Sequence, residues 1–116
     1  MTFRPRSPME VEEEMDRLAA AMEEATEDYR TVAIRAASAE SDYKSAFARC
    51  IVGLANSGKK ITAAEREARA VVSAEAEFRE WRISEASRAA TSEHLRTLRS
   101  RLDAMRTEAA SRRYQG

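Results

Sequence analysis

Cysteine, proline and glycine are scarce in this sequence. Its 116 residues include one cysteine, two prolines and three glycines. The lone Cys50 excludes an internal disulfide and a multi-cysteine metal site, and we expect a cytoplasmic protein. No apolar run approaches the roughly 18 residues that cross a bilayer, and neither predicted helix has a basic face backed by a strongly apolar one, so we expect no membrane contact. The first ten residues lack the apolar segment of a signal peptide.

An excess of charge of one sign is also missing. Lysine plus arginine and aspartate plus glutamate both number 20, so net charge creates no general attraction to nucleic acid or to an acidic surface. Charged residues make up 34% of the chain, which is typical of a long helix or a coiled coil. The length allows one domain at most.

A long first helix is predicted over residues 7–55, after a flexible arm at 1–6. Ser7 can cap it, Pro8 suits its first position, and Glu10 completes a capping box. Apolar residues then recur in alternating steps of four and three, which defines a heptad seam. The residues of this seam are Val11, Met15, Leu18, Met22, Ala25, Tyr29, Val32, Ala36, Ala39, Tyr43, Ala46 and Cys50.

A second long helix is predicted over residues 62–113, followed by a tail at 114–116. Thr62 can cap it, with Glu65 reaching back. Its seam blurs between about 75 and 93, where either a heptad stutter or a second contact surface would explain the pattern. Thr91 or Ser92 can restart a helix, so a break near 91–94 is an open alternative. The seam is clear again at Leu95, Leu98, Leu102, Met105 and Ala109.

The segment between the helices is 56–61, and it overlaps a motif that resembles the start of a phosphate-binding loop. Gly53 to Lys59 reads G-x-x-x-x-G-K, but Lys60 stands where a serine or threonine would hold magnesium. Such a loop also needs a preceding strand, and the sequence predicts none. We therefore expect a turn, with Asn56 or Gly58 ending the first helix in a left-handed conformation.

A turn near residue 58 predicts an all-α fold, a long antiparallel two-helix coiled-coil hairpin. Residues 10–28 hold nine acids and one base, and residues 94–113 hold six arginines and two acids, so the opposite charges favour this orientation. The expected facing pairs are Met22 with Leu95, Leu18 with Leu98, Met15 with Leu102, Val11 with Met105, Ala39 with Phe78, and Ala36 with Trp81.

The apolar residues near the turn exceed what one partner helix can cover, which predicts a protein interface. We expect self-association into a helical bundle, most simply a dimer with four helices. The alternative is a monomeric three-helix bundle in which the second helix folds back. The candidate interface residues are Phe47, Ile51, Leu54, Phe78, Trp81 and Ile83.

No catalytic, cofactor-binding or metal-binding constellation is recognisable, so we expect a protein that is not an enzyme and binds no cofactor. His94 is the only histidine, a metal site would need other ligands, and Cys50 lies far from it along the proposed hairpin. Nucleic-acid binding through basic residues of the turn and second helix is the alternative, although the acidic residues in 10–28 compete for the arginines. Its candidate residues are Lys59, Lys60, Arg66, Arg69, Arg99, Arg106, Arg112 and Arg113.

The part from about 59 to 113 resembles small helical-hairpin proteins that bacteriophages encode near recombination and single-strand-binding genes. The resemblance rests on Thr62, Glu65, Arg66, Ala68, Leu98, Arg99, Leu102, Asp103, Arg106 and Thr107. It implies an accessory role in DNA recombination or replication through a protein partner, in the cytoplasm of a host cell. The sequence therefore favours a helical interaction or scaffold protein, with a DNA-binding accessory and a structural virion component as alternatives.

Overall fold

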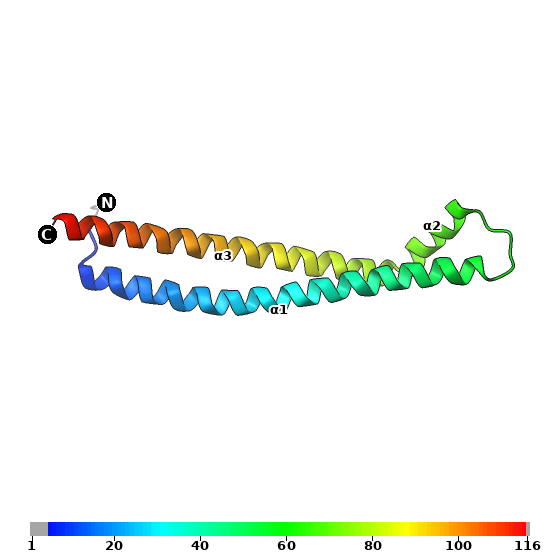
Figure 1. Cartoon of the computed structure of the whole chain (residues 1–116), viewed down its shortest axis with the longest axis horizontal. Helices are drawn as coiled ribbons and strands as arrows, with labels where there is room; N and C mark the ends of the chain where they lie inside the picture. Colours follow the sequence, from blue (N-terminus) through cyan, green and yellow to red (C-terminus); the bar gives the residue numbers. More distant parts are fainter. Residues whose placement is uncertain (1–4, 116) are drawn as a thin grey trace. The chain divides into compact units, whose positions relative to one another are not determined.

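The computed structural model describes the backbone of residues 5–115 and the side chains of residues 5–113. This part of the chain contains no strand; its helices are α1 (Pro8–Ala55), α2 (Ala63–Ser73) and α3 (Glu75–Gln115) (Figure 1). Most of the expected arm at 1–6, and the last residue of the expected tail, lie outside the described residues. Residues 114 and 115 continue α3 where a tail was expected.

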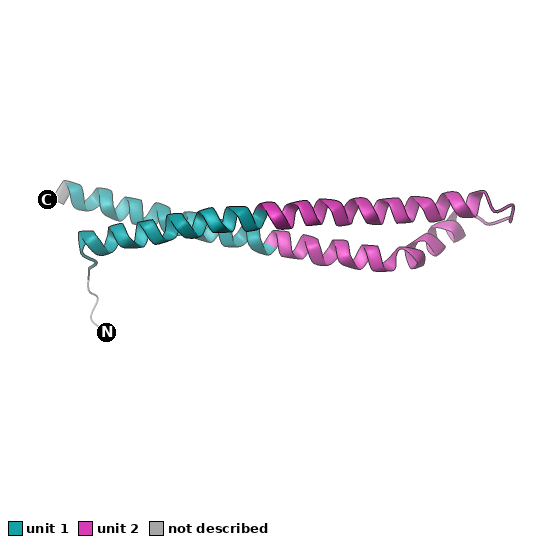
Figure 2. Cartoon of the chain, turned by 90° about the horizontal axis from the view of Figure 1, so that it is seen from below, with its two compact units in different colours: residues 1–29, 90–116 teal, residues 30–89 magenta. Residues whose placement is uncertain are grey.

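The chain divides into two units. Unit 1 comprises Met1–Tyr29 and Ala90–Gly116, and unit 2 comprises Arg30–Ala89 (Figure 2). Within each unit, a part of α1 lies antiparallel to a part of α3, which confirms the predicted all-α antiparallel pairing. In the described part of the chain, no helix is long and apolar enough to cross a membrane.

The start of α1 follows from its capping residues. Ser7 Oγ accepts a hydrogen bond of 3.2 Å from the Glu10 backbone N–H, and Pro8 occupies the first helical position. Proline loses nothing there, because the first N–H groups of a helix have no partner within it. The helix then continues for 48 residues and includes Gly53.

The connection between α1 and α2 is a turn, as predicted. Gly58 has a φ of 75°, a left-handed conformation that glycine adopts without strain. Before it, the Ser57 hydroxyl donates a 2.7 Å hydrogen bond to the Leu54 carbonyl, which satisfies one of the free acceptors at the end of α1. Gly58, and not Asn56, is thus the left-handed residue, and residues 5–57 contain no strand of the kind that a phosphate loop requires before it.

The second helical segment begins as predicted but breaks at an unexpected place. Thr62 Oγ1 accepts a 3.1 Å hydrogen bond from the Glu65 N–H, whereas the Glu65 carboxylate pairs with Arg69 at 2.9 Å. The break falls at Ala74 (φ −99°, ψ 17°), whose N–H still donates to the Ala70 carbonyl at 2.9 Å.

The alternative of a break near 91–94 is wrong, because α3 passes through these residues without interruption. Thr91 and Ser92 are half-buried there. A residue that can cap a helix does so only where the chain leaves the helix, and the seam that resumes at Leu95 keeps this stretch packed and helical.

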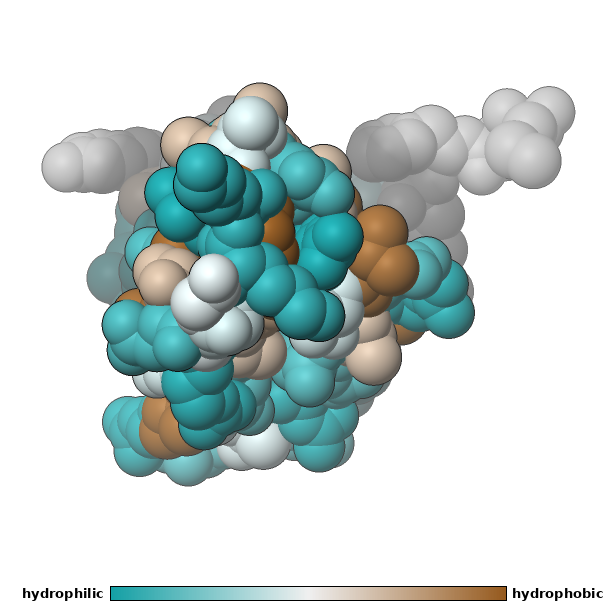
Figure 3. All heavy atoms as spheres, turned by 90° about the vertical axis from the view of Figure 1, so that its right-hand side faces the viewer, coloured by the Kyte–Doolittle hydropathy of each residue, from teal (hydrophilic) through white to brown (hydrophobic). Residues whose placement is uncertain are grey.

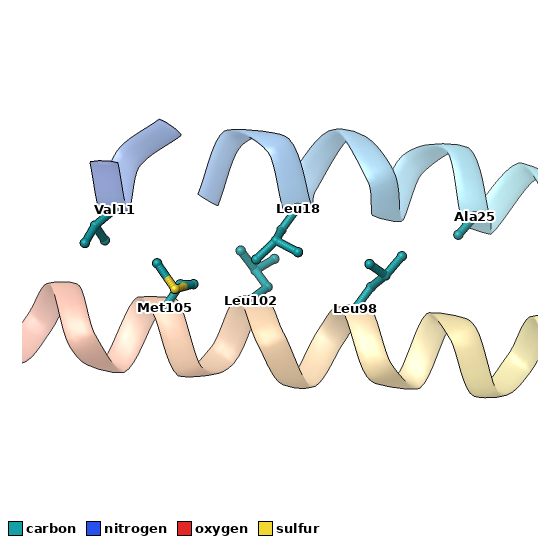
Figure 4. Packing of buried hydrophobic residues seen from close by; sticks show 6 residues of the cluster. All are labelled: Val11, Leu18, Ala25, Leu98, Leu102 and Met105. Carbon is teal, nitrogen blue, oxygen red and sulfur yellow. The ribbon is translucent and has the colours of Figure 1, made fainter. Parts of the chain in front are cut away.

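Unit 1 has a core of large aliphatic side chains. Val11, Leu18 and Ala25 of α1 pack with Leu98, Leu102 and Met105 of α3, and none is more than 6% exposed. Figure 4 shows Leu18 pointing into the space between Leu98 and Leu102. Met15, Met22 and Leu95 pack against this cluster. The residues of four predicted facing pairs thus meet in one core: Met22 and Leu95, Leu18 and Leu98, Met15 and Leu102, and Val11 and Met105.

Unit 2 is packed differently, because only small residues are buried in it. These residues are Ala36, Ala39, Ala70, Ala74 and Ser84. The seam of α3 nevertheless continues here in steps of four and three through Glu77, Trp81, Ser84 and Arg88, each of which is buried or half-buried. The blur in the sequence thus comes from polar residues on an unbroken seam, and not from a stutter.

Candidate protein interface in unit 2

Four aromatic side chains from the two long helices gather on unit 2. The Tyr43 ring stacks on the Trp81 ring at 5.4 Å and meets the edge of the Phe78 ring at 5.3 Å. Phe47 lies 6.0 Å from Tyr43, and Phe78 lies 6.0 Å from Trp81. These separations and tilts suit favourable ring contacts. We call Tyr43, Phe47, Phe78 and Trp81 the aromatic cluster.

The aromatic cluster is not covered by the rest of the chain. Tyr43, Phe47 and Trp81 are half-buried, and Phe78 is 43% exposed. By contrast, the large aliphatic residues at the centre of unit 1 are buried. Aromatic side chains that remain partly exposed to solvent on a helix pair are typical of a surface that another molecule covers.

The structure brings together only part of the predicted interface. Phe47, Phe78 and Trp81 belong to the aromatic cluster, and Ile51 and Leu54 are half-buried on the last turns of α1. Ile83 is 59% exposed. Further large apolar residues of unit 2 are exposed outside the predicted set: Ile34, Val52, Val71 and Val72.

Tyr43 joins the cluster together, but the predicted interface did not include it. Phe78 and Trp81 were expected opposite Ala39 and Ala36, yet both rings contact Tyr43. The reason is the direction of helical side chains, which lean toward the N-terminus of their own helix. In an antiparallel pair the long rings of α1 and α3 lean toward each other, so they meet beyond the positions directly opposite. The sequence signal that could have included Tyr43 in the interface was its position on the seam of α1.

Three buried polar atoms on α3 have no hydrogen-bond partner within the described structure. They are Glu77 Oε2, Trp81 Nε1 and Ser84 Oγ. Their residues follow one another on the seam of α3, and Ser84 is only 3% exposed. A buried polar group without a partner costs about 1–3 kcal/mol. The contact between the helices is therefore weaker in unit 2 than the aliphatic contact in unit 1.

Three ion pairs near the aromatic cluster form along single helices. Lys44 pairs with Glu40 at 2.9 Å, Arg79 with Glu75 at 3.1 Å, and Arg88 with Glu85 at 2.8 Å. The hydrogen bond from Arg88 is the main cause that lowers the pKa of Glu85, and the charges of Arg88 and Arg82 act in the same direction. Glu80 and Arg82, which are exposed on either side of Trp81, lie outside these pairs, so charges of both signs surround the cluster.

The candidate nucleic-acid residues are divided between the units. Lys59 and Lys60 are exposed in the turn of unit 2, and no ion pair is formed by their side chains within the described structure. Seen from the loop end, unit 2 shows apolar side chains at separate places among hydrophilic ones (Figure 3). Arg66 is half-buried, and Arg69 pairs with Glu65 at 2.9 Å.

The arginines of α3 in unit 1 pair mainly within their own helix. Arg96 pairs with Glu93 at 3.0 Å, Arg106 with Asp103 at 3.6 Å, and Arg112 with Glu108 at 3.2 Å. Arg99 and Arg113 are exposed, and neither has an ion-pair partner among the described residues. The acidic residues in 10–28 of α1 therefore do not neutralise these arginines by direct contacts.

The described residues contain no group of three or more histidine, cysteine, aspartate or glutamate side chains that could hold a metal ion. Cys50 is half-buried on the α1 seam of unit 2, and His94 is exposed on α3 of unit 1. Comparison of the chain with family models, curated proteins and solved structures finds no match.

Proposed function

We propose that this protein is a non-enzymatic interaction or scaffold module that binds protein through the aromatic cluster of unit 2. The observation that carries the proposal is the partial exposure of four mutually contacting rings on a helix pair. Aromatic side chains bury a large area where proteins meet, and tryptophan and tyrosine are enriched among the few residues that carry most of the binding energy. The resemblance to phage hairpin proteins supports an accessory role in DNA recombination or replication, exerted through a protein partner in the cytoplasm.

A photo-reactive amino acid at position 78 tests this proposal. The residue would replace Phe78 in protein made in a bacterial host, and a matched variant would carry it at Val72, which is 73% exposed on α2. We expect protein adducts in far higher yield from position 78 than from position 72. Equal yields, or no protein adduct at position 78, would rule out the cluster as the binding surface.

A DNA-binding accessory is the second candidate, and the exposed cations without partners favour it. Lys59, Lys60, Arg99 and Arg113 are available to phosphates in the structure. If they bind nucleic acid, affinity for a single-stranded oligonucleotide falls steeply with salt, and replacing Lys59 and Lys60 with glutamine lowers the slope. Binding with no salt dependence, or no binding at all, would reject this alternative.

A further inference from the structure

The core of unit 2 is incomplete in a single chain. Alanine and serine are its buried residues, whereas Tyr43, Phe47, Phe78 and Trp81 remain partly exposed. Aromatic side chains bury about 150–250 Å² each when they are fully covered. A surface packed against the aromatic cluster would thus give unit 2 the large apolar contacts that unit 1 already has.

The charged residues around the aromatic cluster bear on which kind of molecule can cover it. The three ion pairs Glu40–Lys44, Glu75–Arg79 and Glu85–Arg88 are internal, and exposed charges of both signs, Glu80 and Arg82, flank Trp81. A polyanion such as nucleic acid would meet carboxylates here as well as cations. A second copy brings the same mixture of charges, and in an isologous contact a basic residue of one copy can face an acidic residue of the other.

The solvent-exposed area of the chain is large enough for an interface with a second copy. The chain has a mass of 13.0 kDa and exposes 8888 Å². That area is about 2,500 Å² more than the 6,300 Å² or so expected of a compact monomer of this mass. A standard interface buries about 800 Å² on each partner, so one further copy can be accommodated with surface to spare.

We propose that two copies of this chain form an isologous dimer in which the aromatic clusters of both copies pack together in a four-helix arrangement. The inference rests on the proposed function and specifies its partner. Phe78, the most exposed ring of the cluster, lies within the contact, and the Trp81 ring becomes buried on association. Val72, exposed on α2, lies outside it.

Sedimentation equilibrium over a wide range of concentrations tests the dimer. The wild-type chain and Val72→Glu should both show a two-chain mass, whereas Phe78→Glu should associate at least tenfold more weakly, because a carboxylate would be buried in the contact. Circular dichroism checks that the variants keep the helical content of the wild type. Phe78→Ser is the milder replacement if Phe78→Glu loses helix.

Tryptophan fluorescence of the wild type gives a second readout that needs no variant. Trp81 is the only tryptophan, so dilution through the dissociation range should shift its emission to longer wavelength. A single-chain mass at every concentration, or a Phe78→Glu protein that associates like the wild type, would overturn the dimer. If a monomeric wild type still gives cross-links to another protein from position 78, the second copy is refuted and the interaction module is not. If position 78 gives no protein adduct, both are refuted.

Discussion

At the scale of single residues, side-chain size determines how the two units pack. Leucine, valine and methionine fill the seam of unit 1 and are almost fully buried. In unit 2 the buried seam positions hold alanine and serine, and the large rings remain partly exposed. A seam of small residues brings helices close but buries little apolar area. The stability of the helix pair should therefore come mainly from unit 1.

Replacing Leu102 with alanine tests this distribution. Leu102 is 6% exposed in the unit 1 core, so its truncation should lower the free energy of unfolding by about 2–5 kcal/mol. The equivalent truncation of Val72, which is 73% exposed, should change it by less than about 0.5 kcal/mol. Urea denaturation followed by circular dichroism measures both, and equal effects would contradict the account of the core.

Acid should weaken the Glu85–Arg88 pair. The pKa of Glu85 is lowered in the folded chain, chiefly by the Arg88 hydrogen bond. Its stabilising contribution is therefore complete above the ordinary carboxyl pKa and is lost as the pH falls through the lowered folded-state pKa. Glu85→Gln should be less stable than the wild type at neutral pH, and the difference should vanish at about pH 2.

The matched control for Glu85 is Glu80→Gln. Glu80 is exposed on the same helix and has no ion-pair partner among the described residues. Urea midpoints at several pH values should then separate the two variants at neutral pH. A Glu85→Gln deficit that persists unchanged in acid would show that the carboxylate does not act through its charge.

At the scale of helices, the positions of the ends were predictable because caps are local. Ser7, Gly58 and Thr62 act through neighbours within a few residues, and the sequence shows those neighbours directly. The break at Ala74 has no such signal, since alanine favours helices and no glycine or proline stands beside it. The Tyr43 contacts were missed for another reason, because they depend on where two distant side chains lean.

The two glycines near the turn should respond oppositely to alanine. Gly53 lies inside α1 with open space where a Cβ would be, so Gly53→Ala should stabilise the chain by about 0.5–1 kcal/mol. Gly58 has a φ of +75°, which disfavours a side chain, so Gly58→Ala should destabilise it by about 1 kcal/mol. Thermal and urea unfolding of both variants provide the test, and shifts of the same sign would contradict the assigned conformations.

At the scale of the whole molecule, the two units differ in what they bury. Unit 1 has the aliphatic core, and unit 2 has partly exposed rings, small buried residues and polar atoms without partners in the described structure. The antiparallel pairing was predictable from the seam and the turn. The location of the aromatic cluster was predictable only in part, because polar residues on the α3 seam hid the periodicity that would have placed Trp81.

The most direct test of self-association through unit 2 is the molar mass of the wild type. It should be measured by light scattering during size-exclusion chromatography, at low and high salt, with and without a single-stranded oligonucleotide. The account predicts twice 13.0 kDa under all four conditions, because the proposed contact is formed by apolar rings. A mass of 13.0 kDa, or a salt-sensitive complex with the oligonucleotide, would contradict it.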